Sequence, residues 1–292
     1  MEARDPALSG GQANETVGSD PAAGPARIVG LVPAAALLGL LFVGALAGAL
    51  KVSLVPLGDG LDDASLASWK DLVADPGFAD SLFFTLRISL LSTALAAILG
   101  VALALALRRR GSVLRTLAAL PVPVPHLLVA VVATVWLAPG GVADRVVGGL
   151  PIDVIRDPSG LGITLVYVYK EAPFLAVLVL ASAGRALEER EEAAAVLGVD
   201  RWRRLRWVVW PAIRRPLLIG CVIVAAFAIG AFEVPLAVGP NYPPVLSAYA
   251  FEAVQGDVIA GEGRAAAALL VAGLTSVLLA ALAVRFMRGV DE

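Results

Sequence analysis

Long apolar segments alternate with short polar connectors along most of this chain. Six segments reach the roughly 20 apolar residues that a helix needs to cross a bilayer core. We place them at residues 28–54, 82–107, 113–138, 161–183, 212–238 and 266–287. Such runs are about twice as long as a barrel strand and lack a period of two. The pattern therefore predicts an all-α polytopic membrane protein with six transmembrane helices.

The composition agrees with a membrane protein. Hydrophobic residues make up 59% of the 292 positions, charged residues 16%, and the mean hydropathy is +0.83. These values lie far from those of soluble globular proteins. Residues 1–26 are rich in Gly, Ala, Ser and Pro and show no apolar period. We expect them to form a disordered cytoplasmic tail before a transmembrane domain at 27–292. The first apolar segment is too long for a signal peptide, so we expect it to be retained.

Basic residues are distributed unequally among the connectors. Arginines cluster at 108–115, 185–215 and 285–288, whereas the intervening connectors hold Lys70, Arg145, Arg156 and Arg264. Lys and Arg accumulate on the cytoplasmic side of membrane proteins. The arginine-rich connectors and both chain termini are therefore expected to be cytoplasmic.

The sequence offers no catalytic centre. None of its lysines ends a phosphate-binding loop, so ATP has no cradle in this chain. The single histidine, His126, excludes a His-based metal cluster, and Cys221 is the only cysteine. We expect His126 to be an interfacial or packing residue behind Pro121, Pro123 and Pro125. We therefore predict no enzyme activity, no metal, no cofactor and no nucleic-acid binding.

The cytoplasmic segment at about 185–211 has the features of two helices joined by a sharp turn. Residues 188–197 are strong helix formers, and Gly198 suits the left-handed conformation that ends a helix. Asp200 can cap a second helix that continues to the start of the fifth span at Pro211. On physical grounds alone, this segment is either a partner-binding element or a loop whose arginines fix the topology and bind anionic lipid.

The spacing of residues in this segment resembles the EAA loop of binding-protein-dependent ABC importer permeases, the type I importer transmembrane subunits. The family pattern is Glu-Ala-Ala-x3-Gly-x9-Ile-x-Leu-Pro, and the matching positions are Glu192, Ala193, Ala194, Gly198, Val208, Trp210 and Pro211. Val208 replaces isoleucine and Trp210 replaces leucine. The likeness extends over a permease core at about 75–288. A further stretch, 232–239, is similar to permeases of the polyamine, ferric iron and thiamine importer group.

The resemblance implies the type I importer permease fold and a place in the bacterial cytoplasmic membrane. It also implies several partners: a second permease subunit of the same or a different chain, two cytoplasmic ATPases that bind ATP and Mg, and an external substrate-binding protein that delivers a small solute. In that family the EAA segment is the coupling helix that docks into the ATPase. This role falls on Glu192, Ala193, Ala194 and Gly198. The mechanism implied is alternating access driven by closure of the ATPase pair.

Other membrane functions remain open from the sequence. A secondary transporter or channel would also have six spans, although it would not need an EAA-spaced cytoplasmic helix. A scaffold protein would use its buried charges for structure alone.

Three charged residues lie inside the predicted spans, namely Lys170, Glu171 and Glu233. A charge near a helix centre costs about 2.5 to 3.5 kcal/mol on insertion scales, so each requires a reason. Adjacent residues diverge by about 100° on a helix, so Lys170 and Glu171 should each find a partner on another span. One interpretation is that they line the translocation pathway. The other is a pair of buried ion pairs, Lys170 with Glu233 and Glu171 with Arg87.

Overall fold

The computed structural model describes residues 25–55, 64–182 and 184–289, and all regular structure within these ranges is helical. The chain divides into two units, residues 1–47 and 48–292. The first unit contains most of helix α1 (Pro25–Leu54), whose apolar side chains from Val32 to Leu46 are exposed. The last turns of α1, from Gly48, belong to the second unit. Apart from residues 25 and 26, which begin α1, the predicted tail lies outside the described residues.

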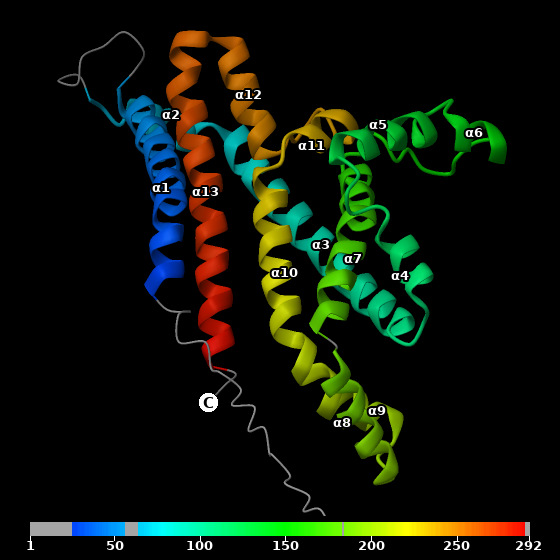
Figure 1. Ribbon diagram of the computed structural model, residues 1–292. Coiled ribbons are helices and arrows are strands. Elements are labelled where there is room, and N and C mark those ends of the chain that lie inside the picture. The colour runs from blue at the N-terminus through cyan, green and yellow to red at the C-terminus, as the bar shows by residue number, and fades with distance from the viewer. Residues whose placement is uncertain (1–24, 56–63, 183, 290–292) are drawn as a thin grey trace, which may run out of the picture. The chain divides into compact units, whose positions relative to one another are not determined.

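The second unit holds the remaining helices (Figure 1). The helices and their bounds are α2 (Ala67–Ala74), α3 (Pro76–Leu107), α4 (Ser112–Ala119), α5 (His126–Leu137), α6 (Val142–Val147), α7 (Leu161–Ser182), α8 (Arg185–Val196), α9 (Arg201–Arg204), α10 (Trp210–Gly230), α11 (Glu233–Val238), α12 (Leu246–Gly256) and α13 (Val258–Gly289). A π-helical turn, Leu205–Val209, joins α9 to α10.

Six stretches of the described residues are long and apolar enough to span a membrane, as predicted. They are Val32–Leu54, Pro76–Leu107, His126–Val147, Leu161–Ser182, Arg201–Gly230 and Gly261–Met287. The second begins earlier than predicted because Pro76 opens α3 and Asp75 caps it. The Asp75 carboxylate accepts a hydrogen bond from the Gly77 N–H at 2.8 Å. Residues 75–77 therefore form the start of a helix.

Two of the six predicted spans are interrupted in the structure. The stretch 113–138 is not one helix, because α4 ends at Ala119 and α5 begins at His126. Prolines within 121–125 lack the N–H that a continuous helix would need. The stretch 212–238 is also interrupted: α10 ends at Gly230, and Ala231 is extended. A helix continued through Pro235 would clash with the Ala231 carbonyl, four residues earlier.

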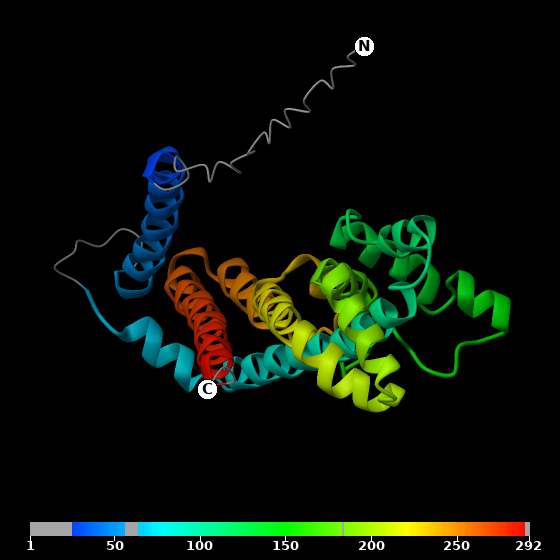
Figure 2. The ribbon, with the colours of Figure 1, turned by 60° about the horizontal axis from the view of Figure 1, so that its bottom comes forward.

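Helix α3 crosses α7 and α10, as both ribbon views show (Figures 1 and 2). The largest buried cluster collects side chains from five helices around this crossing. Its members on these helices are Phe84 and Ile88 of α3, Ala130 of α5, Ile163, Val166 and Tyr167 of α7, Ala228 of α10, and Val234 and Val238 of α11. A second cluster joins α2, α10, α12 and α13. The packing therefore places α5 and α11 against the N-terminal part of α7.

Small residues set the distance between α3 and α7. A Cβ atom placed on Gly100 would lie 2.8 Å from the Ala172 carbonyl oxygen and 2.9 Å from the Leu175 Cβ. Ala96 and Ala104, one turn away on either side, are also buried. Close backbone approach is how helices associate in lipid, where no hydrophobic drive exists between them.

We predict that Gly100→Ala destabilises the protein by about 1–3 kcal/mol, because the added methyl must displace backbone of α7. Gly273→Ala is the matched control, since a Cβ at this α13 position would meet no atom within 4 Å. The midpoint of thermal denaturation in detergent reports the difference. Equal midpoints for the two variants would contradict the close α3–α7 packing.

Candidate functional site

The connector between α7 and α10 folds as a helix, a sharp turn and a second helix, as predicted (Figure 1). Gly198 has φ +77, the left-handed conformation that ends α8. The Asp200 carboxylate then accepts hydrogen bonds from the N–H groups of Trp202 at 2.9 Å and Arg203 at 3.0 Å. The sequence predicted both features, with Gly198 ending the first helix and Asp200 capping the second.

The second helix does not end at Pro211, in contrast to the prediction. Helix α9 passes through the π-helical turn at 205–209 directly into α10. The Trp210 N–H donates to the Leu205 carbonyl across this turn. Pro211 lies in the first turn of α10, where a missing N–H is tolerated. The turn at Gly198 is therefore coupled to the fifth span by uninterrupted helical backbone.

Helix α8 presents one face to the protein and the other to solvent. Leu187 and Glu191 are buried, and Ala194, on the same face, is half-buried. Glu192 and Ala193 lie on the opposite side and are exposed. Of the four predicted coupling residues, Glu192, Ala193 and Gly198 are accessible to a partner, whereas Ala194 faces inward.

The end of α8 carries an exposed apolar surface, here called the α8 tip, made of Val196, Leu197 and Trp202. Their exposed fractions are 88%, 82% and 81%. Isolated exposed apolar residues are common, but three neighbours around one tight turn form a patch that a partner can cover. The tip is accessible without any rearrangement of the chain.

A salt bridge ties α8 to the end of α3. Arg108 donates two hydrogen bonds to the Glu191 carboxylate, at 2.6 and 2.9 Å, and Arg109 lies 3.5 Å from it. The side chains of Arg108 and Glu191 are 19% and 7% exposed. Paired, two-point contacts of this kind fix orientation as well as distance. We call this pair the α3–α8 anchor.

Sequence reasoning missed the anchor. It treated the arginines at 108–115 as topology signals only, and it did not consider Glu191. The one available signal was the four-residue spacing of Leu187 and Glu191, which places both on one face of α8. Arg115 adds a local support, since its side chain donates to the backbone carbonyls of Leu107 and Arg108.

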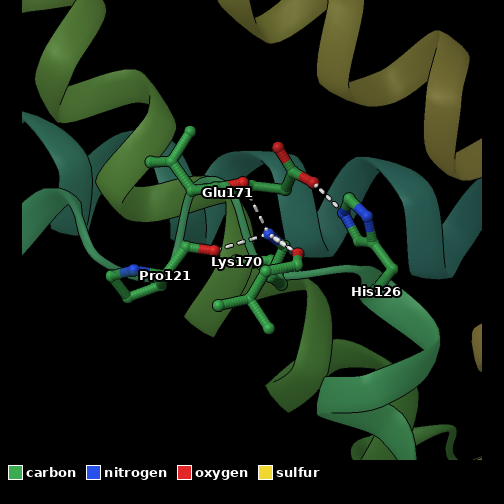
Figure 3. Close-up of polar contacts among 6 residues, drawn as sticks. Pro121, His126, Lys170 and Glu171 are labelled. Atoms are coloured by element: carbon green, nitrogen blue, oxygen red, sulfur yellow. Dashed lines mark hydrogen bonds and ion pairs between the residues drawn. The ribbon is translucent and has the colours of Figure 1, made fainter.

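The charged residues inside the fourth span form a second candidate site (Figure 3). Lys170 on α7 is 3% exposed and donates three hydrogen bonds to backbone carbonyls. Its Nζ lies 2.6 Å from the oxygen of Pro121, 3.0 Å from that of Val122 and 2.5 Å from that of Val124. The acceptors all belong to the segment between α4 and α5.

Glu171, the next residue along α7, makes a different contact. Its Oε1 lies 2.8 Å from the Nε2 of His126, the first residue of α5 (Figure 3). The His126 ring also packs on Phe227 of α10, with ring centroids 4.5 Å apart. His126 therefore packs against a neighbouring helix, as expected. It also makes a polar contact with Glu171, the only carboxylate of α7.

The predicted separation of Lys170 and Glu171 is confirmed, but both proposed ion pairs are wrong. Glu233 is exposed and begins α11 after the break that follows α10, so it is not inside a helix of the fifth span. Arg87 donates to the Ser159 carbonyl at 2.7 Å instead of pairing with Glu171. The sequence could not foresee that backbone carbonyls, exposed by prolines, would take the place of carboxylates. Among the described residues, His, Cys, Asp and Glu form no group of three that could hold a metal.

Polar contacts hold the connector that follows α11 to its neighbours. Arg156 donates to the Asn241 side chain at 3.0 Å, and the Tyr242 hydroxyl donates to Asp80. That hydrogen bond and the nearby charge raise the pKa of Tyr242. Tyr242 is still 60% exposed. Within the proline-rich stretch 240–244, Asn241 and Tyr242 are therefore held by hydrogen bonds and still exposed.

Comparisons with known proteins agree with this architecture. Two solved structures of bacterial ABC transporters that import alginate, one of them bound to a periplasmic protein carrying alginate pentasaccharide, contain similar chains. They superpose with TM-scores of 0.72 and 0.70 at 19% and 20% identity. Each match covers 91% of this chain, and they cover 94% and 100% of the other chains. The shared fold is therefore that of an ABC importer permease.

Curated relatives point in the same direction. The inner membrane ABC transporter permease protein YnjC of Escherichia coli is 28% identical over 210 residues, which is 70% of this chain and 41% of YnjC. The trehalose transport system permease protein SugA of Mycobacterium tuberculosis is 28% identical over 177 residues, 58% of this chain and 56% of SugA. The chain thus spans about half the length of these two relatives. Neither relative is named as a member of the polyamine, iron and thiamine importer group. The assignment of this chain to that group therefore stays a prediction.

A family profile matches residues 95–292, well over half of the chain, and this range includes α7, α8 and α10. The profile describes the inner membrane component of binding-protein-dependent transport systems. With its six candidate spans, the chain is a multi-pass protein of the cytoplasmic membrane that belongs to the family of binding-protein-dependent transport system inner membrane components.

Proposed function

We propose that the chain is the permease subunit of an ATP-driven importer and that α8 couples it to a separate cytoplasmic ATPase. The observation that carries this proposal is the exposed α8 tip on a rigid support. An exposed apolar patch held by a salt bridge and by continuous helix is suited to transmit force from a partner. Glu192, Ala193 and Gly198 border this surface, whereas Ala194 supports it from within.

Force has two routes from α8 into the membrane domain. One runs through the α3–α8 anchor into α3, which packs along α7 and α10. The other runs through the Gly198 turn and α9 into α10. Because both routes reach the same group of spans, displacement of α8 would move that group as a rigid body. Motion of this kind supports alternating access.

The proposal includes the orientation and the partners expected from the sequence. With α8 in the cytoplasm, both termini are cytoplasmic, and the Asn241–Tyr242 region faces outward toward a substrate-binding protein. A second permease, identical or different, completes the pathway for a small solute, and two ATPases bind ATP and Mg. The alginate transporter solved with its periplasmic protein supports the binding-protein partner for a chain of the same fold.

A secondary transporter or channel is the alternative, and reconstitution distinguishes the two. The complex purified through a tagged chain from its native membranes is placed in vesicles. Vanadate-sensitive ATP hydrolysis that rises when the external binding protein is added supports the proposal. Solute flux driven by an ion gradient, with no hydrolysing subunit in the complex, would favour the alternative.

We predict that Val196→Asp weakens ATPase binding at least about thirtyfold, since loss of an interface anchor costs about 2 kcal/mol or more. Glu192→Lys should weaken binding in the same direction. Both side chains are exposed, so folding should be unaffected. The measurement is the dissociation constant of the purified ATPase for the chain in nanodiscs.

The matched control for this pair is Asp153→Lys, a charge reversal at an exposed residue of the connector between α6 and α7. It should leave ATPase binding unchanged. Wild-type affinity in Val196→Asp would show that the α8 tip is not the docking surface.

We further predict that Arg108→Gln uncouples ATP hydrolysis from transport. Breaking a fully buried ion pair costs about 3–5 kcal/mol, and the partly exposed anchor should lose no more than the lower figure. The ATPase should still bind, because the α8 tip is retained, but its hydrolysis should no longer respond to the binding protein. Hydrolysis rates with and without that protein give the measurement.

Arg110→Gln is the control for the anchor, because Arg110 is exposed and forms no part of the pair. The exchange Arg108→Glu with Glu191→Arg should recover part of the response. If Arg108→Gln responds to the binding protein as fully as the wild type, the anchor does not transmit force.

A further inference from the structure

The segment 120–125 interrupts the protein between α4 and α5 and leaves backbone carbonyls without helical partners. Pro121, Pro123 and Pro125 have no N–H to donate, so a regular ladder cannot cross this segment. The N–H groups of this segment make three turn bonds, from Leu120 to Leu117 at 3.3 Å, from Val122 to Ala119 at 3.0 Å and from Val124 to Pro121 at 3.3 Å. The Pro121 carbonyl therefore accepts one long turn bond, and none of the three bonds involves the carbonyls of Val122 and Val124. In a bilayer, carbonyls that lack partners must be satisfied from within the protein.

The Lys170 side chain supplies hydrogen-bond donors in place of the N–H groups that the prolines lack. An ammonium group has three donors and no acceptor. All three are used on carbonyls of this one segment, and the side chain is buried. Among the residues that the structure describes, no carboxylate lies within ion-pair distance of Lys170, so its charge interacts with backbone dipoles. A residue with every donor occupied and 3% exposure is poorly placed to meet a passing solute.

Glu171 contacts the residue that directly follows the interrupted segment. It contacts His126, which follows the prolines and begins α5. Lys170 and Glu171 point in directions about 100° apart on α7. One turn of α7 therefore contacts the chain before the start of α5 through Lys170 and at its start through Glu171 (Figure 3).

We propose that Lys170 is a positioning residue whose ammonium caps the interruption at 120–125 and, together with Glu171, fixes α5 on α7. This role goes beyond the proposed importer function, because it does not depend on the solute or on ATP. It also resolves the two interpretations left open by the sequence: Lys170 neither lines a pathway nor forms an ion pair, but completes the backbone hydrogen bonding of a broken span.

Chemical rescue tests the cap directly. In the full chain in membranes, Cys221→Ser removes the single cysteine, and Ala130→Cys places a thiol on α5 at a position that is 0% exposed. N-ethylmaleimide should modify this thiol slowly. Adding Lys170→Ala should raise the modification rate at least about tenfold, because α5 opens locally when its cap is lost.

Propylammonium, which matches the removed part of the side chain, should restore protection in Lys170→Ala. 1-Propanol, which has similar size and no charge, should not. Lys70→Ala is the matched control, since Lys70 is exposed on α2, and it should leave the rate unchanged. Unchanged protection in Lys170→Ala, or equal rescue by propylammonium and 1-propanol, would overturn the proposal.

A second variant covers the case in which Lys170→Ala is not recovered from the membrane. Lys170→Gln keeps an amide donor of shorter reach, so its modification rate should lie between those of the parent and a fully uncapped chain. Expression of Lys170→Ala in the presence of propylammonium should restore its yield. A Lys170→Gln chain as protected as the parent, with no effect of propylammonium on the yield of Lys170→Ala, would contradict the cap.

Discussion

The hydrocarbon core of a bilayer offers no hydrogen-bond partner to the protein backbone, and the fold depends on meeting this constraint at each place where a helix breaks. At the interruption before α5, the Lys170 ammonium donates hydrogen bonds to the carbonyls of three residues. At the end of α10, the Ser247 hydroxyl donates to the Ala231 carbonyl at 2.7 Å. Side chains from neighbouring helices thus replace the missing helical bonds, and each replacement also fixes the position of a helix.

The same principle acts at the ends of the spans, where an unpaired backbone group costs less because water is closer. Asp75 caps α3 and also accepts a hydrogen bond from the Tyr249 hydroxyl of α12 at 2.7 Å. Burial, followed by this bond to a carboxylate, raises the pKa of Tyr249 to about 12, so the hydroxyl remains a donor at any physiological pH. Caps that reach across helices make the second unit a connected body instead of a set of independent spans. A connected body is what an external helix such as α8 needs if it is to move several spans together.

Sequence reasoning recovered the features that follow from local rules. The spans follow from the length of apolar runs, and the α8–α9 turn follows from Gly198 and Asp200, whose preferences are local. It failed where a partner comes from a distant part of the chain. One of the two interpretations of Lys170 paired it with Glu233, because opposite charges are the usual solution, but its acceptors are carbonyls that lie some 50 residues earlier in the chain. The anchor between Arg108 and Glu191 joins residues 83 positions apart, and no local signal connects them.

The central claim is that α8 is a rigid lever seated in a separate ATP-hydrolysing subunit. The most direct measurement is a structure, by electron cryomicroscopy, of the assembly isolated through this chain from its native membranes. The account predicts that Val196, Leu197 and the exposed face around Glu192 are buried in a groove of an ATPase, with the Arg108–Glu191 pair intact behind them. An assembly in which this face meets only lipid or water, with no ATPase against α8, would contradict it.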